Sequence, residues 1–206
     1  RERFARLAAF DAAQAGEPLA GVDEAGRGPL AGPVACAAVV LPPGLPPFVI
    51  NDSKRLNPRQ REQAAVVIRE RALAWSVVMV DRAEIDRDNI LQATLAGMRR
   101  AWLALAVRPG LTLIDGDRPP AGVDPVRLLV GGDGRSLAVA CASVLAKVAR
   151  DAYMVDLDAR WPGYGFARHK GYGTAAHLAA LRGLGPCPEH RLSFAPVRDV
   201  AGAAGG

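Results

Sequence analysis

The stretch Ala-Gly-Val-Asp-Glu-Ala-Gly-Arg-Gly-Pro-Leu-Ala-Gly-Pro-Val occupies residues 20–34 and is the most informative part of this chain. Its first apolar residues predict a short buried strand over residues 18–23, which ends at two adjacent acids, Asp23 and Glu24. A Gly-Arg-Gly turn follows at residues 26–28. Carboxylates bind hard cations, whereas glycine amides and an arginine side chain bind phosphate oxygens. The stretch therefore predicts a metal-dependent site that acts on a phosphodiester backbone.

Outward from this stretch, the hydrophobic pattern alternates between strands and helices. Short aliphatic runs predict four further strands, at residues 33–41, 74–80, 111–114 and 126–130. Apolar residues at helical spacing predict helices over residues 57–72, 83–106 and 136–160 and near residues 174–183. This order predicts one α/β domain, residues 1–206, built on a mixed sheet. The segment after residue 160 is expected to be loop-rich, and residues 201–206 are expected to fray.

Two further acids follow predicted strands in the same way as Asp23. Asp115 and Asp133 each lie at or just beyond a strand end, where the sites of open α/β sheets collect. Repulsion among converging carboxylates would be offset by a hard divalent cation, and oxygen ligands favour Mg²⁺ or Mn²⁺ over zinc. Each Asp also precedes a glycine, so a simple turn is the alternative for either one. Asp117 and Asp124 are weaker candidates from the same region.

The adjacent pair Asp23 and Glu24 raises a geometric question. Neighbouring residues on a strand point to opposite faces of the sheet, so both can serve one site only if the strand ends or bulges there. The glycines at positions 26 and 28 make such an irregularity plausible. We therefore expect the strand to end or to bulge at this pair.

The glycines of residues 26–32 have two interpretations. A dinucleotide-binding fingerprint is rejected, because it requires a helix after the glycines, and here prolines lead into a Val-rich strand. The segment is then either a plain hairpin connection or a loop whose amides approach a nucleic-acid backbone closely, with no Cβ in the way. The glycines alone do not choose between these two.

Composition narrows the class of protein. The chain has 206 residues and a formal net charge of +5, which fits a polyanionic partner. Basic residues and aromatic residues are interleaved between positions 160 and 191, as in many phosphate-binding surfaces. The candidate phosphate contacts are Lys54, Arg168, Lys170 and Arg191. Three scattered cysteines and no membrane-length apolar segment favour a cytoplasmic protein with no membrane association, and we expect a monomer.

The opening motif, from Asp23 to Val34, resembles that of the ribonuclease HII (type 2 ribonuclease H) family. Similar segments follow in the family's order along nearly the whole chain. They are residues 51–56, 84–90, 113–116, 142–151, 169–174 and 190–194. Many members carry a lysine before the Gly-Asp pair that matches Asp133, whereas this chain has Gly131. Asp151, four residues after Lys147 on the predicted helix, is the rival for the fourth acid, although an ion pair with that lysine is the simpler role for it.

The resemblance implies a ribonuclease H-like fold, a five-stranded mixed sheet flanked by helices, with a small helical C-terminal part from about residue 160 that contacts substrate. It implies endonucleolytic cleavage of RNA in RNA–DNA hybrids and incision at single ribonucleotides embedded in duplex DNA. Cleavage would leave 3′-hydroxyl and 5′-phosphate ends.

The resemblance also assigns roles to individual residues. The acids that match the family's metal ligands are Asp23, Glu24, Asp115 and Asp133, which would hold two divalent ions. The residues that match its substrate contacts are Gly26, Arg27, Gly28 and Tyr172, which would recognise the ribonucleotide 2′-hydroxyl and the RNA–DNA junction. The three histidines, His169, His177 and His190, are candidate proton shuttles, although a structural role is the commoner one for loop histidines.

Three other functions compete with this one. Another nuclease of the same fold, such as a resolvase or an integrase core, would not carry the opening motif. A non-catalytic nucleic-acid-binding module would lack one of the carboxylates, and none is missing here. A nucleotide-binding protein would need a helix after Gly28, which the sequence does not support.

Overall fold

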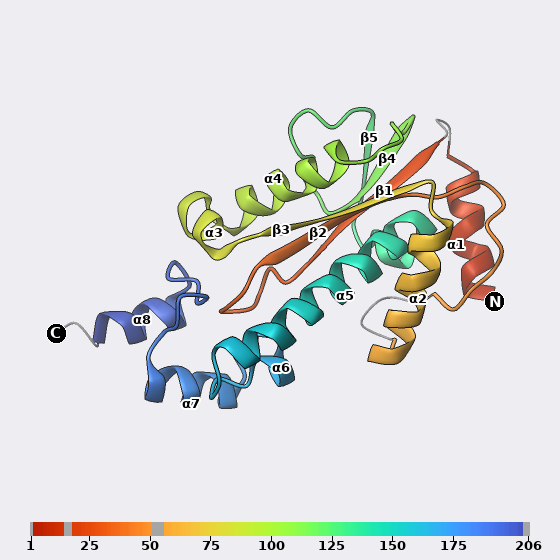
Figure 1. Ribbon diagram of the computed structural model, residues 1–206. Helices are drawn as coiled ribbons and strands as arrows, with labels where there is room; N and C mark the ends of the chain where they lie inside the picture. Colours follow the sequence, from red (N-terminus) through yellow and green to blue (C-terminus); the bar gives the residue numbers. More distant parts are fainter. Residues whose placement is uncertain (1, 15–17, 51–55, 204–206) are drawn as a thin grey trace.

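Five strands form one mixed sheet in the computed structural model, which describes residues 2–14, 18–50 and 56–203 (Figure 1). The strands are β1 (Leu19–Ala25), β2 (Val34–Val40), β3 (Ala74–Val80), β4 (Leu111–Asp115) and β5 (Val126–Leu129). Their spatial order is β3-β2-β1-β4-β5, with β1, β2 and β3 antiparallel and β1, β4 and β5 parallel. All five agree closely with the strands predicted from the sequence.

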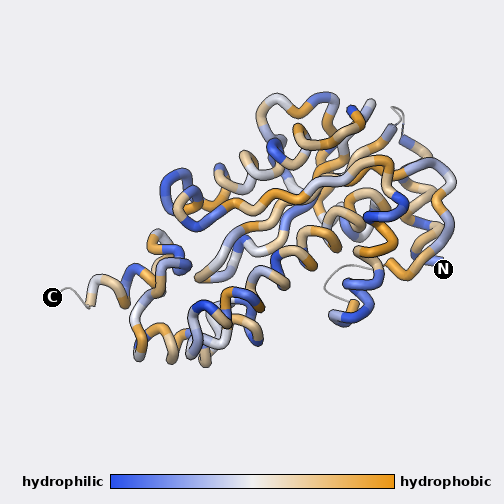
Figure 2. Tube along the Cα trace, viewed as in Figure 1, coloured by the Kyte–Doolittle hydropathy of each residue, from blue (hydrophilic) through white to orange (hydrophobic). Residues whose placement is uncertain are grey.

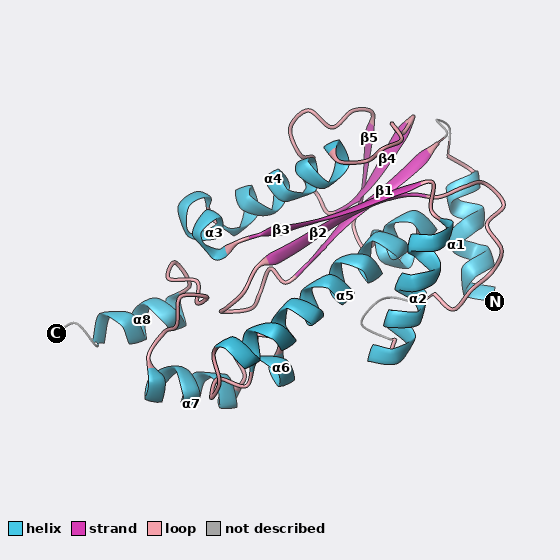
Figure 3. Ribbon diagram, viewed as in Figure 1, coloured by secondary structure: helices cyan, strands magenta, loops and turns pink. Residues whose placement is uncertain are grey.

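Helices cover both faces of this sheet (Figure 3). They are α1 (Glu2–Ala12), α2 (Pro58–Arg71), α3 (Arg82–Asp88), α4 (Ile90–Leu103), α5 (Leu137–Arg160), α6 (Phe166–His169), α7 (Ala175–Leu184) and α8 (Ala195–Ala203), with a 3₁₀ turn, η1, at Gly132–Gly134. Helices α1, α2 and α5 pack on one face, and α3 and α4 pack on the other. The expected five-stranded mixed sheet flanked by helices is therefore confirmed.

Strand β2 lies at the centre of the packing, because each of its faces carries a separate apolar cluster. Ala35, Ala37 and Val39 point toward α1, α2 and α5, whereas Cys36 and Ala38 point toward α4. Every residue of β2 is buried, as expected of a strand covered on both sides. The tube coloured by hydropathy shows the apolar residues gathered along the sheet and along the inner faces of the helices (Figure 2).

Four helical features differ from the sequence prediction, and one of them is the short helix α6 in the segment expected to be loop-rich. The region 83–106 is not one helix, because Asn89 has a φ of 67° that ends α3, and its side chain caps α4. Helix α1 was not expected, and neither was α8, which includes residues 201–203 of the tail that was expected to fray.

Helix α2 begins as predicted, with Asn57 in a reciprocal capping box with Gln60. No helix of the described residues is long and apolar enough to cross a lipid bilayer.

Helix α5 lies against β1 at unusually close range. A Cβ built on Gly21 would come 2.1 Å from the carbonyl carbon of Ala138 and 2.3 Å from the amide nitrogen of Val139. Backbone atoms cannot move aside as a flexible side chain can. The absence of a side chain at Gly21 therefore sets how deeply α5 sits on the sheet, and with it the position of every residue that α5 contributes to the site.

We expect Gly21→Ala to lower the free energy of unfolding by about 3 kcal/mol or more, because the added methyl overpacks a backbone contact. Gly183→Ala is the matched control, since its Cβ would meet nothing within 4 Å in exposed helix α7. That control should raise stability by up to about 1 kcal/mol through helix propensity. Urea unfolding curves of both variants measure the difference. Equal effects would contradict the packing argument.

Candidate active site

A pocket of about 350 Å³ opens where β1, β4 and β5 end, beside α5. It collects residues from five separate parts of the chain. Its lining residues are Asp23, Glu24, Ala25, Gly26, Arg27, Gly28, Asp115, Asp133, Ser143, Lys147 and Tyr172. The four acids singled out in the sequence therefore share one pocket with the Gly-Arg-Gly loop and with the aromatic residue expected to contact substrate.

Asp23 and Glu24 reach this pocket without the strand irregularity that the sequence suggested. Both remain paired with β2, Asp23 opposite Ala37 and Glu24 opposite Cys36, and β1 continues to Ala25. The expected end or bulge is therefore wrong. The β1–β4 pairing stops at Val22 and Ile114, so β1 extends past the end of its parallel neighbour. Side chains on either face of this projecting segment can reach around the end of β4.

Burial makes negative charge costly in this pocket. Asp23 is 5% exposed, and desolvation raises the pKa of its carboxyl well above the usual range, with the charges of Glu24 and Asp115 adding to the effect. Burial also raises the pKa of Glu24, and the charge of Asp115 contributes, although the Arg27 guanidinium 3.5 Å from Glu24 opposes the shift. The pocket therefore holds carboxylates whose charge its own cations do not fully offset.

Asp115 and Asp133 come together through the backbone. The Oδ1 of Asp115 accepts a hydrogen bond of 2.9 Å from the amide of Gly132, which ties the end of β4 to the turn that carries Asp133. Asp151, the rival for the fourth position, does not line the pocket. Its carboxylate lies 2.7 Å from Lys147 Nζ and 3.6 Å from Arg61, so it forms the ion pair expected of an i,i+4 partner.

The donor set of the pocket fits a hard divalent cation. It offers carboxylate oxygens from three different strand ends, which are the ligands that Mg²⁺ and Mn²⁺ prefer. The raised pKa of buried Asp23 shows that added positive charge would be stabilising there. Within residues 2–14, 18–50 and 56–203, no three His, Cys, Asp or Glu side chains already form a metal-binding group. The four acids share the pocket but are not gathered into a preformed cage.

The Gly-Arg-Gly loop joins β1 to β2 and is shaped by two buried arginines. Arg191, which is fully buried, donates to the carbonyl oxygens of Gly26, Arg27 and Gly32 at 2.7–2.9 Å. Arg150 donates to the carbonyls of Pro33, at 2.9 Å, and Ala31, at 3.3 Å. The carbonyl groups of residues 26, 27 and 31–33 thus point onto two cations.

This arrangement gives Arg191 a different role from the one expected. A direct phosphate contact requires an exposed guanidinium, whereas that of Arg191 is buried and donates its hydrogen bonds to the loop. Desolvation lowers the pKa of Arg191 to about 9 and that of Arg150 to about 10, so both still carry charge at neutral pH. Gly26, with a φ of 97°, has no Cβ because one would lie 1.9 Å from Arg150 Nε. Both arginines therefore hold the loop from its buried side.

The other predicted substrate contacts are placed unequally. Tyr172 is 46% exposed and lies against the loop, since a Cβ on Gly28 would be 3.7 Å from its ring. Lys170 does not line the pocket. Its Nζ donates to the carbonyl of Ala167 at 2.7 Å, and burial lowers its pKa. Arg168 is exposed. Lys54 lies outside the described residues.

Two residues of the pocket were missed in the sequence. Ser143 and Lys147 lie one turn apart on α5 and both line the pocket. Ser143 donates a hydrogen bond that counteracts the raised pKa of Asp23. Their spacing of four residues was the available signal, because it places them on one face of a predicted helix. Nothing in that spacing alone indicates which face meets the sheet.

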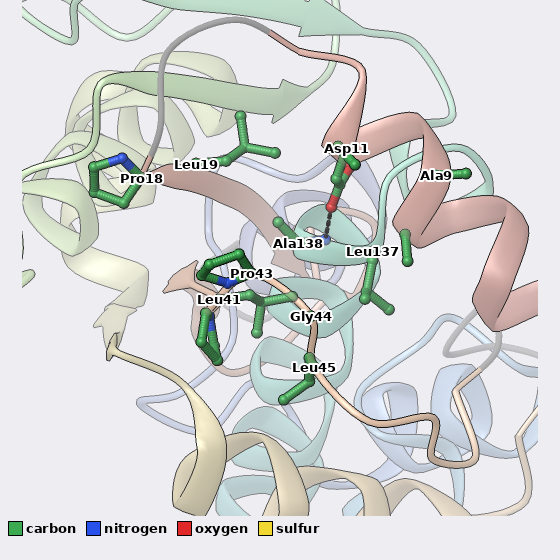
Figure 4. A pocket seen from close by; sticks show the side chains of 13 residues that line it. Ala9, Asp11, Pro18, Leu19, Leu41, Pro43, Gly44, Leu45, Leu137 and Ala138 are labelled. Atoms are coloured by element: carbon green, nitrogen blue, oxygen red, sulfur yellow. Dashed lines mark hydrogen bonds between the residues drawn. The ribbon is translucent and has the colours of Figure 1, made fainter.

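A second pocket, of about 590 Å³, lies at the N-terminal end of α5 and carries no comparable chemistry (Figure 4). It is formed by α1, the loop at residues 41–45 and the first turn of α5. Asp11 is its single acid and caps α5, accepting from the amide of Ala138 at 2.8 Å. Burial raises the pKa of Asp11 to about 6. A single carboxylate among apolar residues serves here as a helix cap. The pocket that contains the four acids is therefore the candidate active site.

The fold is of the ribonuclease H-like class. The structure is similar to ribonuclease H2 from Pyrococcus horikoshii OT3, with a TM-score of 0.73 and 24% identity, over 90% of this chain and 97% of that one. It is similar to Bst-RNase HIII, solved in complex with Mn²⁺, with a TM-score of 0.69 and 20% identity, over 96% and 73% of the two chains. At these identities the likeness establishes the fold.

Sequence comparison specifies the family. The family model for ribonuclease HII matches residues 20–197. Ribonuclease HII of Nitrosococcus oceani is 54% identical over 183 residues, which cover 89% of this chain and 91% of that protein. Ribonuclease HII of Xanthomonas campestris is 56% identical over 186 residues, covering 89% and 78%. The chain belongs to the ribonuclease HII family, and it is a metal-dependent endoribonuclease that cleaves RNA in RNA–DNA hybrids.

We expect Asp23→Asn to raise the stability of the metal-free protein at pH 8, because burial and the charges of Glu24 and Asp115 raise the pKa of this carboxyl, whereas the amide carries no charge. A carboxyl whose folded-state pKa is raised contributes stability below its unfolded pKa, near 4, and loses it as pH rises. The gain from the neutral amide should therefore grow between pH 4 and pH 8. Thermal unfolding in the presence of a chelator measures it.

Asp151→Asn provides the comparison, because it removes a carboxylate that two cations already neutralise. It should leave stability unchanged or lower it by up to about 1 kcal/mol. A loss of stability in Asp23→Asn as large as that in Asp151→Asn would contradict the view that the pocket acids repel one another.

Proposed function

We propose that this ribonuclease incises duplex DNA at single embedded ribonucleotides as well as cleaving longer RNA–DNA hybrids. The observation that carries the proposal is the convergence, in one pocket, of four carboxylates, the Gly-Arg-Gly loop and Tyr172. The carboxylates suit metal-assisted hydrolysis of a phosphodiester. The loop and the tyrosine line the same pocket beside them. Reactive groups and recognition groups are thus neighbours.

In the proposed site, Asp23, Glu24, Asp115 and Asp133 hold two divalent cations, Mg²⁺ or Mn²⁺. Bound there, such ions supply an activated water and neutralise charge on the leaving oxygen, and hydrolysis leaves 3′-hydroxyl and 5′-phosphate ends. Asp23 is buried and close to the charges of Glu24 and Asp115, so added cations would stabilise its carboxylate. Ser143 orients Asp23 through its hydroxyl.

Recognition of the ribonucleotide falls to the residues beside the acids. In a trans peptide the N–H points opposite to the C=O of the same unit. Because Arg191 holds the carbonyls of Gly26 and Arg27, the amides of Arg27 and Gly28 point away from it. We propose that these amides bind the 2′-hydroxyl, the group that distinguishes RNA from DNA. The ring of Tyr172 would stack on the neighbouring sugar at the RNA–DNA junction.

The test is cleavage of duplex DNA that contains one ribonucleotide, with Mg²⁺, Mn²⁺ or a chelator. The wild-type protein should nick on the 5′ side of the ribonucleotide only when metal is present. Asp23→Asn should lose about a thousandfold or more of the rate while still binding the duplex in gel-shift assays. Asp117→Asn, an exposed acid beyond the same strand end as Asp115, is the control and should cleave normally. Near-normal cleavage by Asp23→Asn would refute the assignment.

Tyr172→Ala should lower the kcat/KM for the single-ribonucleotide duplex about tenfold more than that for an all-RNA strand in a hybrid, because one stacking contact is worth ~1–3 kcal/mol. The metal concentration for half-maximal activity should not change. Tyr172→Phe keeps the ring and should retain the ratio of the two rates. If Tyr172→Ala weakens both substrates and metal binding alike, the tyrosine has no part in reading the junction.

A further inference from the structure

Behind Tyr172 lies a buried chain of hydrogen bonds that the reaction itself does not use. Cys187 N donates to His190 Nδ1 at 3.0 Å, the Nε2 atoms of His190 and His177 are 3.1 Å apart, and His177 Nδ1 lies 2.9 Å from the carbonyl oxygen of Tyr172. His177 is 0% exposed and His190 is 1% exposed. The rings pack against Phe166 and His169.

The partners at the two ends fix the position of every proton along this chain. The carbonyl of Tyr172 can only accept, so His177 carries its proton on Nδ1 and leaves Nε2 as an acceptor. The amide of Cys187 can only donate, so His190 Nδ1 accepts and its proton lies on Nε2. His190 Nε2–H then donates to His177 Nε2. All three hydrogen bonds are satisfied together only when both rings are neutral and in these opposite tautomers.

The surroundings favour that neutral state. Desolvation lowers the pKa of His190 to about 4, and the facing His177 adds to the effect. Desolvation also lowers the pKa of His177. Neither ring therefore gains a proton at neutral pH, and the direction of the chain, from Cys187 to Tyr172, is maintained. These rings are poorly suited to shuttle protons in the reaction.

The chain also connects the two surfaces assigned to the ribonucleotide. His190 forms an isolated β-bridge with Ala31, in the loop that carries Gly-Arg-Gly, and its neighbour Arg191 donates its amide to the carbonyl of Leu30 at 2.8 Å. Tyr172 lies between Gly171 and Gly173, so its backbone has little intrinsic stiffness. His190 thus contacts the loop through its backbone, and its side chain is linked to the backbone of Tyr172 through His177.

We propose that His177 and His190 are positioning residues, whose fixed tautomers hold the ring of Tyr172 at a set distance from the Gly-Arg-Gly loop. The inference rests on the proposed function, because it takes that spacing to be what recognises the ribonucleotide beside deoxyribonucleotides. The histidines touch no substrate. They determine specificity through the tyrosine.

The first test is spectroscopic and needs no substrate. Heteronuclear NMR spectra of the imidazole nitrogens in the wild-type protein at neutral pH should show a proton on Nδ1 of His177 and on Nε2 of His190. A charged ring, or either opposite tautomer, would overturn the proposal. This readout is independent of the assignment of Tyr172 to the junction. It therefore separates failure of the assigned tautomers from failure of the proposed function.

The second test is kinetic and uses two variants of one residue. His177→Leu removes the donor to Tyr172 and should lower the ratio of single-ribonucleotide incision to hybrid cleavage about tenfold, the factor for a hydrogen bond worth ~1.4 kcal/mol. His177→Asn keeps an N–H near the Nδ1 position and should stay within about threefold of wild type. In a Tyr172→Ala background, His177→Leu should leave the ratio unchanged.

A purely structural role for His177 gives a different pattern. It would slow both substrates equally, or would alter their ratio just as much without the tyrosine, and either result refutes the positioning role. If His177→Leu does not fold, the comparison of His177→Asn with wild type and the tautomer spectra still decide. If Tyr172→Ala alone leaves the ratio unchanged, the proposed role of the tyrosine fails, and with it the functional part of this inference.

Discussion

The capture of one loop's carbonyl groups by two buried arginines is the interaction on which the candidate site depends. Within residues 2–14, 18–50 and 56–203, no carboxylate forms an ion pair with Arg150 or Arg191, and the hydrogen bonds of these two side chains go to five backbone oxygens between residues 26 and 33. Burying a charge is costly unless its donors are used, so the loop must keep its carbonyls in place. The direction in which the loop's amides point follows from this requirement.

The sheet supplies the second constraint. Strand β1 projects beyond β4, so two consecutive acids on opposite faces of a strand meet the same pocket. Gly21, two residues before Asp23, lets α5 approach closely and brings Ser143 and Lys147 to the acids. The carboxylates, the loop and the tyrosine are therefore placed by contacts from several elements, and no single helix or strand positions the whole site.

The sequence predicted the strands well, because alternating and continuous apolar runs reflect burial directly. It predicted that the acids lie near one another, because each follows a strand and the sites of open α/β sheets collect at the edge where these strands end. It failed where the answer depended on a distant partner. The break between α3 and α4 depends on the positive φ of Asn89, which asparagine tolerates. The helical spacing of apolar residues continues across this position, so it does not reveal the break. The inward position of Arg191 could not be inferred, because a basic residue near aromatic residues suits a surface as well as an interior. Lys54 falls outside the described residues and remains a prediction.

The separation along the chain between the loop and its support has a consequence for biosynthesis. Residues 26–28 emerge from the ribosome long before Arg191, which bonds to the carbonyls of Gly26 and Arg27 and follows Arg27 by 164 residues. Until Arg191 is made, the carbonyls of Gly26 and Arg27 lack the donor that fixes them, although the carboxylates of β1 are already present. A nascent chain thus acquires the acids of β1 before the residue that holds the Gly-Arg-Gly loop, so the pocket takes its folded form only after Arg191 has been made.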